Sequence, residues 1–213
     1  MRTDEILKRV TGPAVLDVGC AGHIIKPKSP YWLHGRLREQ FPSLVGIDLH
    51  KDNVARLREL GFENVHVASA ENFDLDSKFD TIVAGELIEH LSNPSMFLNR
   101  CHLHLKPGGR VVITTPYVFS LLYVLYAYVK FPNTCQNNEH TTWFCPQTLS
   151  ELVARSGLTV KEWEIVEDYE MENSSMLYRI FALFISTLGK FLIPARLRKN
   201  NMIFVCTKID SGR

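Results

Sequence analysis

The sequence lacks any marked excess of one charge. Its 24 lysine and arginine residues stand against 23 aspartates and glutamates, which gives a formal net charge of +1. Without a global positive field there is no reason to expect nucleic acid as a partner. The sequence also lacks a Cys-x-x-Cys pair, and its five cysteines are irregularly spaced and odd in number. Unpaired thiols indicate a reducing compartment, so we expect a cytoplasmic protein.

Long apolar runs are missing as well. The longest uncharged run, Tyr117 to Val129, is shorter than the ~20 residues that a membrane-spanning helix needs. The start of the chain has no apolar segment behind a basic one, so we expect no secretory signal. There is no internal repeat and no low-complexity linker. We therefore expect a single domain over 1–213, which is long enough to bury a substantial core.

Short apolar runs alternate with helical patterns along the chain. The runs predict strands at 14–18, 44–47, 65–67, 79–84, 110–115, 158–165 and 202–207. The patterns predict helices at 3–10, 31–40, 53–60, 94–105, 117–130, 146–156 and 176–193. The Pro-Gly-Gly at 107–109 is expected to turn the chain. This alternation predicts an α/β fold with a parallel sheet and right-handed crossovers.

Small and acidic residues follow the first four predicted strands. In such folds ligands bind beyond the carboxyl ends of the strands. Small residues let backbone amides approach a ligand closely, and a carboxylate at the end of the second strand can accept hydrogen bonds from both ribose hydroxyls. The candidate cofactor-binding residues are Asp17, Gly19, Cys20, Ala21, Gly22, Asp48, Leu49, Ser69, Ala70, Glu71 and Gly85. Taken alone, Asp48 could equally cap the helix that follows it.

Four segments together resemble the class I S-adenosylmethionine-dependent methyltransferases. The segments are Val15-Leu16-Asp17-Val18-Gly19-Cys20, Val45-Gly46-Ile47-Asp48, Phe79-Asp80-Thr81-Ile82-Val83 and Leu105-Lys106-Pro107-Gly108-Gly109. The resemblance covers about residues 10–165 and implies a Rossmann-like, doubly wound, seven-stranded and mostly parallel sheet. It implies S-adenosylmethionine as cofactor, with a cofactor-binding core at about 10–116.

The same resemblance assigns parts of the cofactor to these residues. Asp17, Gly19 and the turn after them would hold its methionine part, Asp48 its ribose, and the turn from Ser69 to Glu71 its adenine. Two positions of the loop that are usually glycine in the family are Ala21 and His23 here.

Two carboxylates and an imidazole follow the fourth strand, at Glu86, Glu89 and His90, and a second imidazole, His140, lies in a later loop. The pattern resembles the ubiquinone-pathway O-methyltransferases and the small-RNA 2′-O-methyltransferases, where equivalent residues bind a divalent metal beside the acceptor hydroxyl. This resemblance predicts a site for Mg²⁺, Mn²⁺ or Zn²⁺ formed by Glu86, Glu89, His90 and His140. The alternative is a site without metal, in which His90 or His140 is the catalytic base or only holds a turn.

The segments 117–156 and 168–196 are expected to form a helical lid inserted into the fold. Their apolar content favours a small or lipid-linked hydroxyl acceptor. An apolar stretch beside basic residues, as in 176–199, is typical of a peripheral membrane contact. The alternative is that the apolar helices pack on each other or across a homodimer.

The predicted reaction is therefore methyl transfer to an oxygen. Two alternatives stay open at this point: a metal-free N- or C-methyltransferase, and a cofactor-binding subunit that has lost catalysis.

Overall fold

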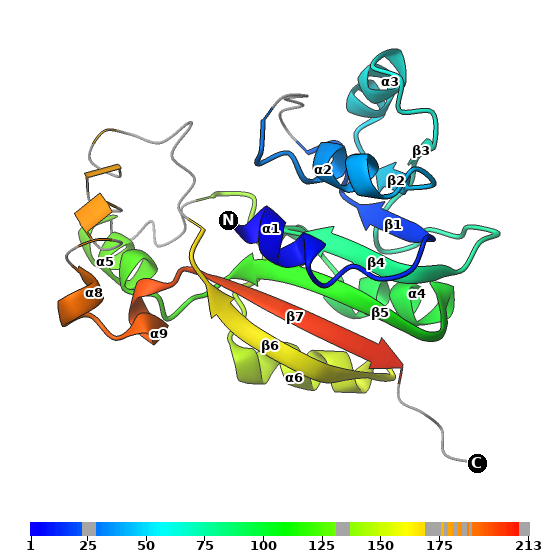
Figure 1. Cartoon of the computed structure of the whole chain (residues 1–213). Helices are drawn as coiled ribbons and strands as arrows, with labels where there is room; N and C mark the ends of the chain where they lie inside the picture. Colours follow the sequence, from blue (N-terminus) through cyan, green and yellow to red (C-terminus); the bar gives the residue numbers. More distant parts are fainter. Residues whose placement is uncertain are drawn as a thin grey trace.

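Seven strands form one sheet in the order β3-β2-β1-β4-β5-β7-β6 (Figure 1). The computed structural model describes residues 1–22, 29–130, 137–168, 176, 179–180, 183–184, 187 and 189–208. The strands are β1 (Val15–Val18), β2 (Val45–Asp48), β3 (Val65–Val67), β4 (Phe79–Gly85), β5 (Leu105–Pro116), β6 (Leu158–Val166) and β7 (Asn201–Lys208). The predicted seven-stranded, mostly parallel α/β sheet is confirmed.

The first five strands are parallel, and β7 runs antiparallel between β5 and β6. From β1 the chain adds β2 and β3 on one side of the sheet, and it then returns to add β4 and β5 on the other. Ligands bind at such a reversal, beyond the carboxyl ends of the two central strands. In this chain the reversal lies between β1 and β4.

Helices cover both faces of the sheet because alternate strand residues point to opposite sides. Ile82 of β4 belongs to a buried cluster with Phe97 and Leu149, whereas the adjacent Val83 packs in a second cluster with Ile6 and Leu37. The helices are α1 (Arg2–Leu7), α2 (Leu33–Gln40), α3 (Lys51–Glu59), the 3₁₀ turn η1 (Ile88–His90), α4 (Pro94–His104), α5 (Leu121–Lys130), α6 (Pro146–Arg155), α8 (Gly189–Leu192) and α9 (Ala195–Arg198). Thus α4 and α6 cover one face, and α1 and α2 the other.

The predicted turn at 107–109 is wrong, because β5 begins at Leu105 and runs through the Pro-Gly-Gly. Leu105 pairs with Phe79 and Arg110 with Thr81, so the strand residues between them form an irregularity opposite a single residue of β4. A Cβ on Gly109 would lie 2.9 Å from the carbonyl oxygen of Phe79. The glycines therefore permit a local irregularity within one continuous strand.

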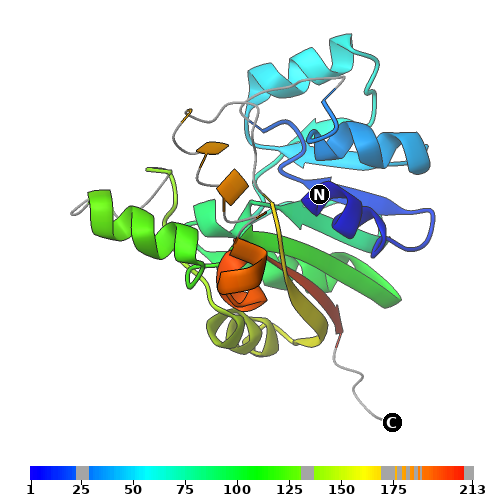
Figure 2. The same ribbon diagram turned by 60° about the vertical axis from the view of Figure 1, so that its left-hand side comes forward.

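The apolar helices after β5 also differ from the prediction. α5 begins at Leu121, later than the predicted residue 117, because the hydroxyl of Ser120 accepts a hydrogen bond from the amide of Tyr123 and caps the helix. Of the predicted helix 176–193, Met176, Arg179, Ile180, Leu183 and Phe184 are helical, most of the rest up to 188 lies outside the described residues, and α8 follows. No helix in the described part of the chain is long and apolar enough to cross a membrane. Figures 1 and 2 show α5, α8 and α9 together beyond one end of the sheet.

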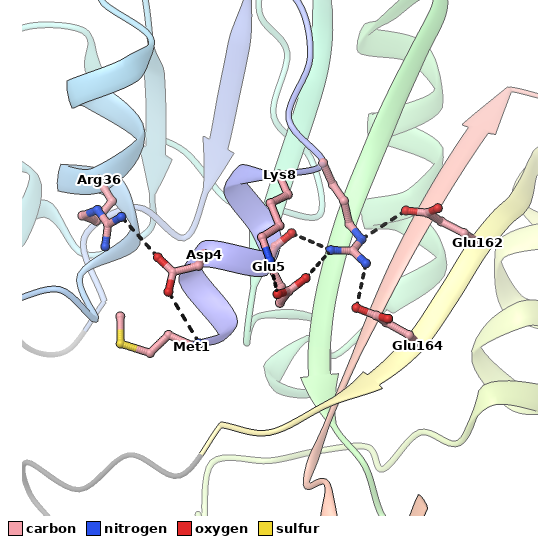
Figure 3. A network of polar contacts seen from close by, with 8 residues as sticks. Met1, Asp4, Glu5, Lys8, Arg36, Glu162 and Glu164 are labelled. Atoms are coloured by element: carbon pink, nitrogen blue, oxygen red, sulfur yellow. Dashed lines mark hydrogen bonds and ion pairs between the residues drawn. The ribbon is translucent and has the colours of Figure 1, made fainter. Parts of the chain in front are cut away.

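Ion pairs attach α1 to the rest of the domain (Figure 3). The guanidinium of Arg9, just after the helix, contacts Glu5 at 2.9 Å, Glu162 at 3.1 Å and Glu164 at 2.7 Å. On the other side of the helix, Arg36 of α2 lies 3.2 Å from Asp4. The first helix is therefore fastened to the edge strand β6 and to α2.

We expect Arg9→Ala to lower the free energy of unfolding by about 1 kcal/mol, because it removes three ion pairs, two of which join distant parts of the chain. The control is Arg155→Ala, which removes one exposed pair within α6, to Glu151. It should change stability by less than about 0.5 kcal/mol. Urea denaturation of both variants measures the difference, and equal effects would show that the Arg9 cluster adds nothing to the fold.

Candidate active site

A cavity of about 780 Å³ lies at the carboxyl ends of the strands, where the strand order reverses. It is lined by residues that follow β1, β2, β3 and β4, together with residues of the later loop. Most of the predicted site residues line it: Gly19, Gly22, Asp48, Leu49, Ser69, Ala70, Glu71, Gly85, Glu86, Glu89, His90 and His140. The predicted cofactor turns and the acid–imidazole cluster thus share one cavity.

The carboxylate of Asp48 organises the loop after β1. Its Oδ2 accepts hydrogen bonds from the amides of Ala21 at 2.9 Å and Gly22 at 3.3 Å, and its Oδ1 accepts one from the amide of His50. The chain can turn here because Gly19 adopts a φ of +82°, which a side chain would strain. Asp48 therefore does more than precede α3: it fixes the path of the glycine loop. His23, further along this loop, lies outside the described residues.

Asp17, Cys20 and Ala21 do not line the cavity. The carboxylate of Asp17 is buried and lies 2.9 Å from Nδ1 of His34, which is buried as well. Cys20 is buried, and desolvation together with the charges of Asp17 and Asp48 raises the pKa of its thiol, so the thiol stays protonated. These three buried residues therefore support the loop from the interior of the protein and not from the cavity. His34 was not singled out in the sequence, although its spacing of three from the buried Leu37 places both on one face of α2.

The turn after β3 is held by its own side chains. The hydroxyl of Ser69 accepts a hydrogen bond from the amide of Glu71 at 3.2 Å, and the carboxylate of Glu71 accepts one from the amide of Asn93 at 3.0 Å. This turn is therefore attached to the start of α4, and Ser69, Ala70 and Glu71 remain on the cavity wall.

Glu86 follows β4 in an unusual conformation, with a φ of +53° that non-glycine residues rarely adopt. Its carboxylate accepts a hydrogen bond from Asn201 at 2.8 Å and lies 3.2 Å from the guanidinium of Arg2. The chain does not continue from β4 into a regular helix, because β4 is followed by this strained residue and then by η1. Glu86 lies outside the group that could hold a metal.

Glu89, His90 and His140 form that group, with one ligand atom from each residue and all three atoms within 4.8 Å of one another. The two imidazoles meet edge to face, with ring centroids 4.7 Å apart. Glu89 is almost fully buried; its Oε2 accepts a hydrogen bond from Thr115, whereas its Oε1 is buried and has no hydrogen-bond partner. A buried carboxylate oxygen without a donor fits a cation or a donor supplied by a ligand.

The loop that carries His140 is fastened to η1 by backbone hydrogen bonds. The carbonyl oxygen of Glu89 accepts from the amides of Thr141 at 2.8 Å and Thr142 at 3.2 Å. The hydroxyl of Thr141 also donates to the carbonyl oxygen of Leu91 at 2.7 Å. Residues 50 positions apart are thereby joined, which places His140 beside His90.

Burial sets the protonation of this group. Desolvation, reinforced by the charge of Glu86, raises the pKa of Glu89 well above its usual range. Desolvation and the neighbouring His90 lower the pKa of His140 to about 4. His140 is therefore neutral at physiological pH, and neutral imidazole is the form that binds metals.

A polar wall lies on one side of the cavity, and of its residues only Glu86 was predicted from the sequence. Arg2, Glu86, Asp168, Asn200 and Asn201 line this side. Arg2 lies 3.3 Å from Asp168, whose amide donates to the side chain of Asn200 at 2.8 Å. The sequence signals were weak, since Arg2 is at the start of the first helix and the two asparagines only precede the last strand. Tyr123 of α5 also lines the cavity and meets Trp143 edge to face.

Residues 2–162 match the family model described as "Methyltransferase domain". The mitochondrial ubiquinone biosynthesis O-methyltransferase of Rattus norvegicus is 31% identical over 168 residues, which are 72% of this chain and 46% of that protein. The ubiquinone biosynthesis O-methyltransferase of Nitrobacter winogradskyi is 32% identical over 121 residues, 54% of this chain and 42% of that protein. The chain thus spans about half the length of these two curated relatives.

Solved structures share the fold. An S-adenosylmethionine-dependent methyltransferase from Archaeoglobus fulgidus matches with a TM-score of 0.64 and 19% identity, covering 97% of this chain and 91% of that one. At this identity the match supports the fold alone.

We expect Asp48→Ala to weaken the binding of S-adenosylhomocysteine by roughly 10- to 100-fold, because the loop amides lose a charged acceptor. Isothermal titration calorimetry measures the affinity. The control is Asp52→Ala, an exposed carboxylate in the first turn of α3. If both variants bind as the unaltered protein does, the loop at Asp48 is not the cofactor site.

Proposed function

Because this chain belongs to the class I S-adenosylmethionine-dependent methyltransferases, we propose that it transfers the methyl group of this cofactor to the oxygen of a hydroxyl acceptor. The observation that carries the proposal is the group formed by Glu89, His90 and His140, which lies in the same cavity as the cofactor turns. An acceptor bound between the cofactor and this group would have the methyl donor on one side and the three side chains of the group on the other.

The residues that would bind the cofactor are those of the cavity wall that follow the first three strands. Asp48 and the turn from Ser69 to Glu71 would hold the ribose and the adenine, and the loop from Gly19 to Gly22 the methionine part. Bound there, the cofactor supplies an electrophilic methyl group. The chain's own contribution is to hold the acceptor oxygen in line with that methyl group, which can supply much of the rate enhancement.

The acid–imidazole group suits a metal better than a catalytic base. A histidine with a pKa of about 4 is a weak base for removing a proton from a hydroxyl group at neutral pH. The same shift keeps its imidazole neutral, and Glu89 offers a buried oxygen without a donor. Glu89, His90 and His140 would hold a divalent cation, for which mixed carboxylate and imidazole ligands suit Mn²⁺ or Zn²⁺ and also allow Mg²⁺. When bound, such an ion lowers the pKa of the acceptor hydroxyl and orients it.

An apolar, hydroxyl-bearing acceptor, small or lipid-linked, fits the rest of the cavity. Tyr123 and Pro116 contribute an apolar part to the wall of the cavity. The two curated relatives are named for O-methylation in ubiquinone biosynthesis, which supports an oxygen as the acceptor atom.

The metal is tested by removing it and by removing a ligand. We expect excess EDTA to abolish methyl transfer, and added Mg²⁺, Mn²⁺ or Zn²⁺ to restore it. His140→Ala should weaken binding of the restoring metal by more than about tenfold, since loss of an outer-shell contact alone has such an effect. Calorimetry with the metal alone measures this binding without any acceptor.

The matched control is His102→Ala, because His102 is a partly exposed histidine on α4 that does not line the cavity. Full activity in excess EDTA would overturn the metal assignment and leave His90 or His140 as the base.

The acceptor atom is tested with radiolabelled S-adenosylmethionine and a panel of phenols, polyprenyl phenols, glycans and RNA ends, with an aniline paired to each phenol. We expect labelled methyl on oxygen, and faster transfer to the apolar hydroxyl compounds, because the cavity has an apolar wall. Label found only on nitrogen or carbon would refute O-methylation. Transfer to none of them, together with intact cofactor binding, would indicate a subunit without catalysis.

A further inference from the structure

Exposed apolar side chains gather around α5, α8 and α9. Of the 16 large hydrophobic residues that are exposed in the described part of the chain, nine belong to this region: Phe119, Val124, Tyr128, Met176, Ile180, Leu183, Phe184, Phe191 and Leu192. We call them the α5–α9 face. Phe191 and Leu192 are the most exposed of those on α8, at 88% and 78%. An accumulation of exposed apolar side chains in one region marks an interaction site.

The same region is strongly basic. The segments 117–138 and 173–199 contain six basic residues and no acidic one: Lys130, Arg179, Lys190, Arg196, Arg198 and Lys199. The remainder of the chain has 18 basic residues against 23 acidic ones. The near-neutral net charge of the chain is therefore the sum of a positive region and a negative remainder. A positive region favours an anionic partner.

We propose that the α5–α9 face docks on an anionic phospholipid membrane, with Phe191 and Leu192 entering the boundary of the acyl chains and Lys190, Arg196 and Lys199 contacting the headgroups, whereas Arg198 is paired with Glu167. Apolar side chains flanked by lysine and arginine are what such a surface binds. A second copy of the chain fits less well, because a two-fold interface would place this basic face against itself.

The face shares its helices with the wall of the cavity. Tyr123 of α5 lines the cavity, whereas Val124, the next residue, is exposed. α9 leads directly into Asn200 and Asn201, which line it too. If the proposed function holds, a lipid-linked acceptor could therefore pass from the membrane into the site without crossing water. Docking itself depends on neither the cofactor nor the acceptor.

The test is flotation of the full chain with two kinds of vesicle, one of phosphatidylcholine alone and one of equal parts phosphatidylcholine and phosphatidylglycerol. We expect binding to the mixed vesicles, little binding to phosphatidylcholine alone, and loss of binding at high salt. Phe191→Ser with Leu192→Ser should reduce binding at least about tenfold, because two buried apolar side chains are lost. Arg196→Glu with Lys199→Glu should do the same through charge.

Matched controls change the same kinds of residue elsewhere. Leu60→Ser with Leu103→Ser alters two exposed leucines, and Lys51→Glu with Arg56→Glu reverses two exposed charges on α3. Both should bind as the unaltered protein does. Binding of S-adenosylhomocysteine by every variant shows that the fold and the cofactor site are intact.

Three results would overturn the proposal: no binding to the mixed vesicles, equal binding to both kinds, or equal loss in the control variants. A dimer in gel filtration that Phe191→Ser with Leu192→Ser abolishes would assign the face to a second copy instead.

Discussion

The acidic and imidazole side of the site depends on one carbonyl oxygen, that of Glu89. It receives the amides of Thr141 and Thr142, and those bonds hold a loop from the second half of the chain against the turn after β4. A single hydrogen bond is worth only about 1 kcal/mol, but two amides of the same loop donate to this one oxygen. These bonds hold the loop in one position relative to η1, and His140 therefore lies beside His90. The arrangement of the Glu89, His90 and His140 side chains therefore depends on hydrogen bonds between backbone groups.

Electrostatics link this region to the first helix. Arg2 lies between Glu86 and Asp168, and its positive charge opposes the burial that raises the pKa of Glu89. Glu86 in turn adds a negative charge beside Glu89. The helix that brings Arg2 there is itself fixed by the ion pairs of Arg9 and Arg36 at the surface. Interactions far from the cavity therefore help to position the charges inside it.

Much of the fold could be predicted from the sequence, and the failures have local causes. All seven strands were predicted from their apolar runs, most of which end at glycine, proline or an acidic residue, and the positions of Gly19, Asp48 and Ser69 follow from where these runs end. The Pro-Gly-Gly at 107–109 was misjudged because a bulge and a turn need the same residues. The position of Glu86 depends on a backbone angle that no side-chain pattern encodes. His34 and Arg2 act through partners distant in the chain, and one sequence offers no signal for such contacts.

The place of β7 has a consequence for how the chain folds as it is synthesised. This strand, made after the six other strands of the sheet, inserts between β5 and β6, and among the described strands β6 pairs with β7 alone. Until β7 emerges, the nascent protein consists of a five-stranded parallel sheet whose open edge at β5 can pair with another chain. The half of the domain that carries the cofactor turns can form early, whereas Asn201 is placed only after β7 has been synthesised. Aggregation during synthesis should therefore begin at the exposed edge of β5.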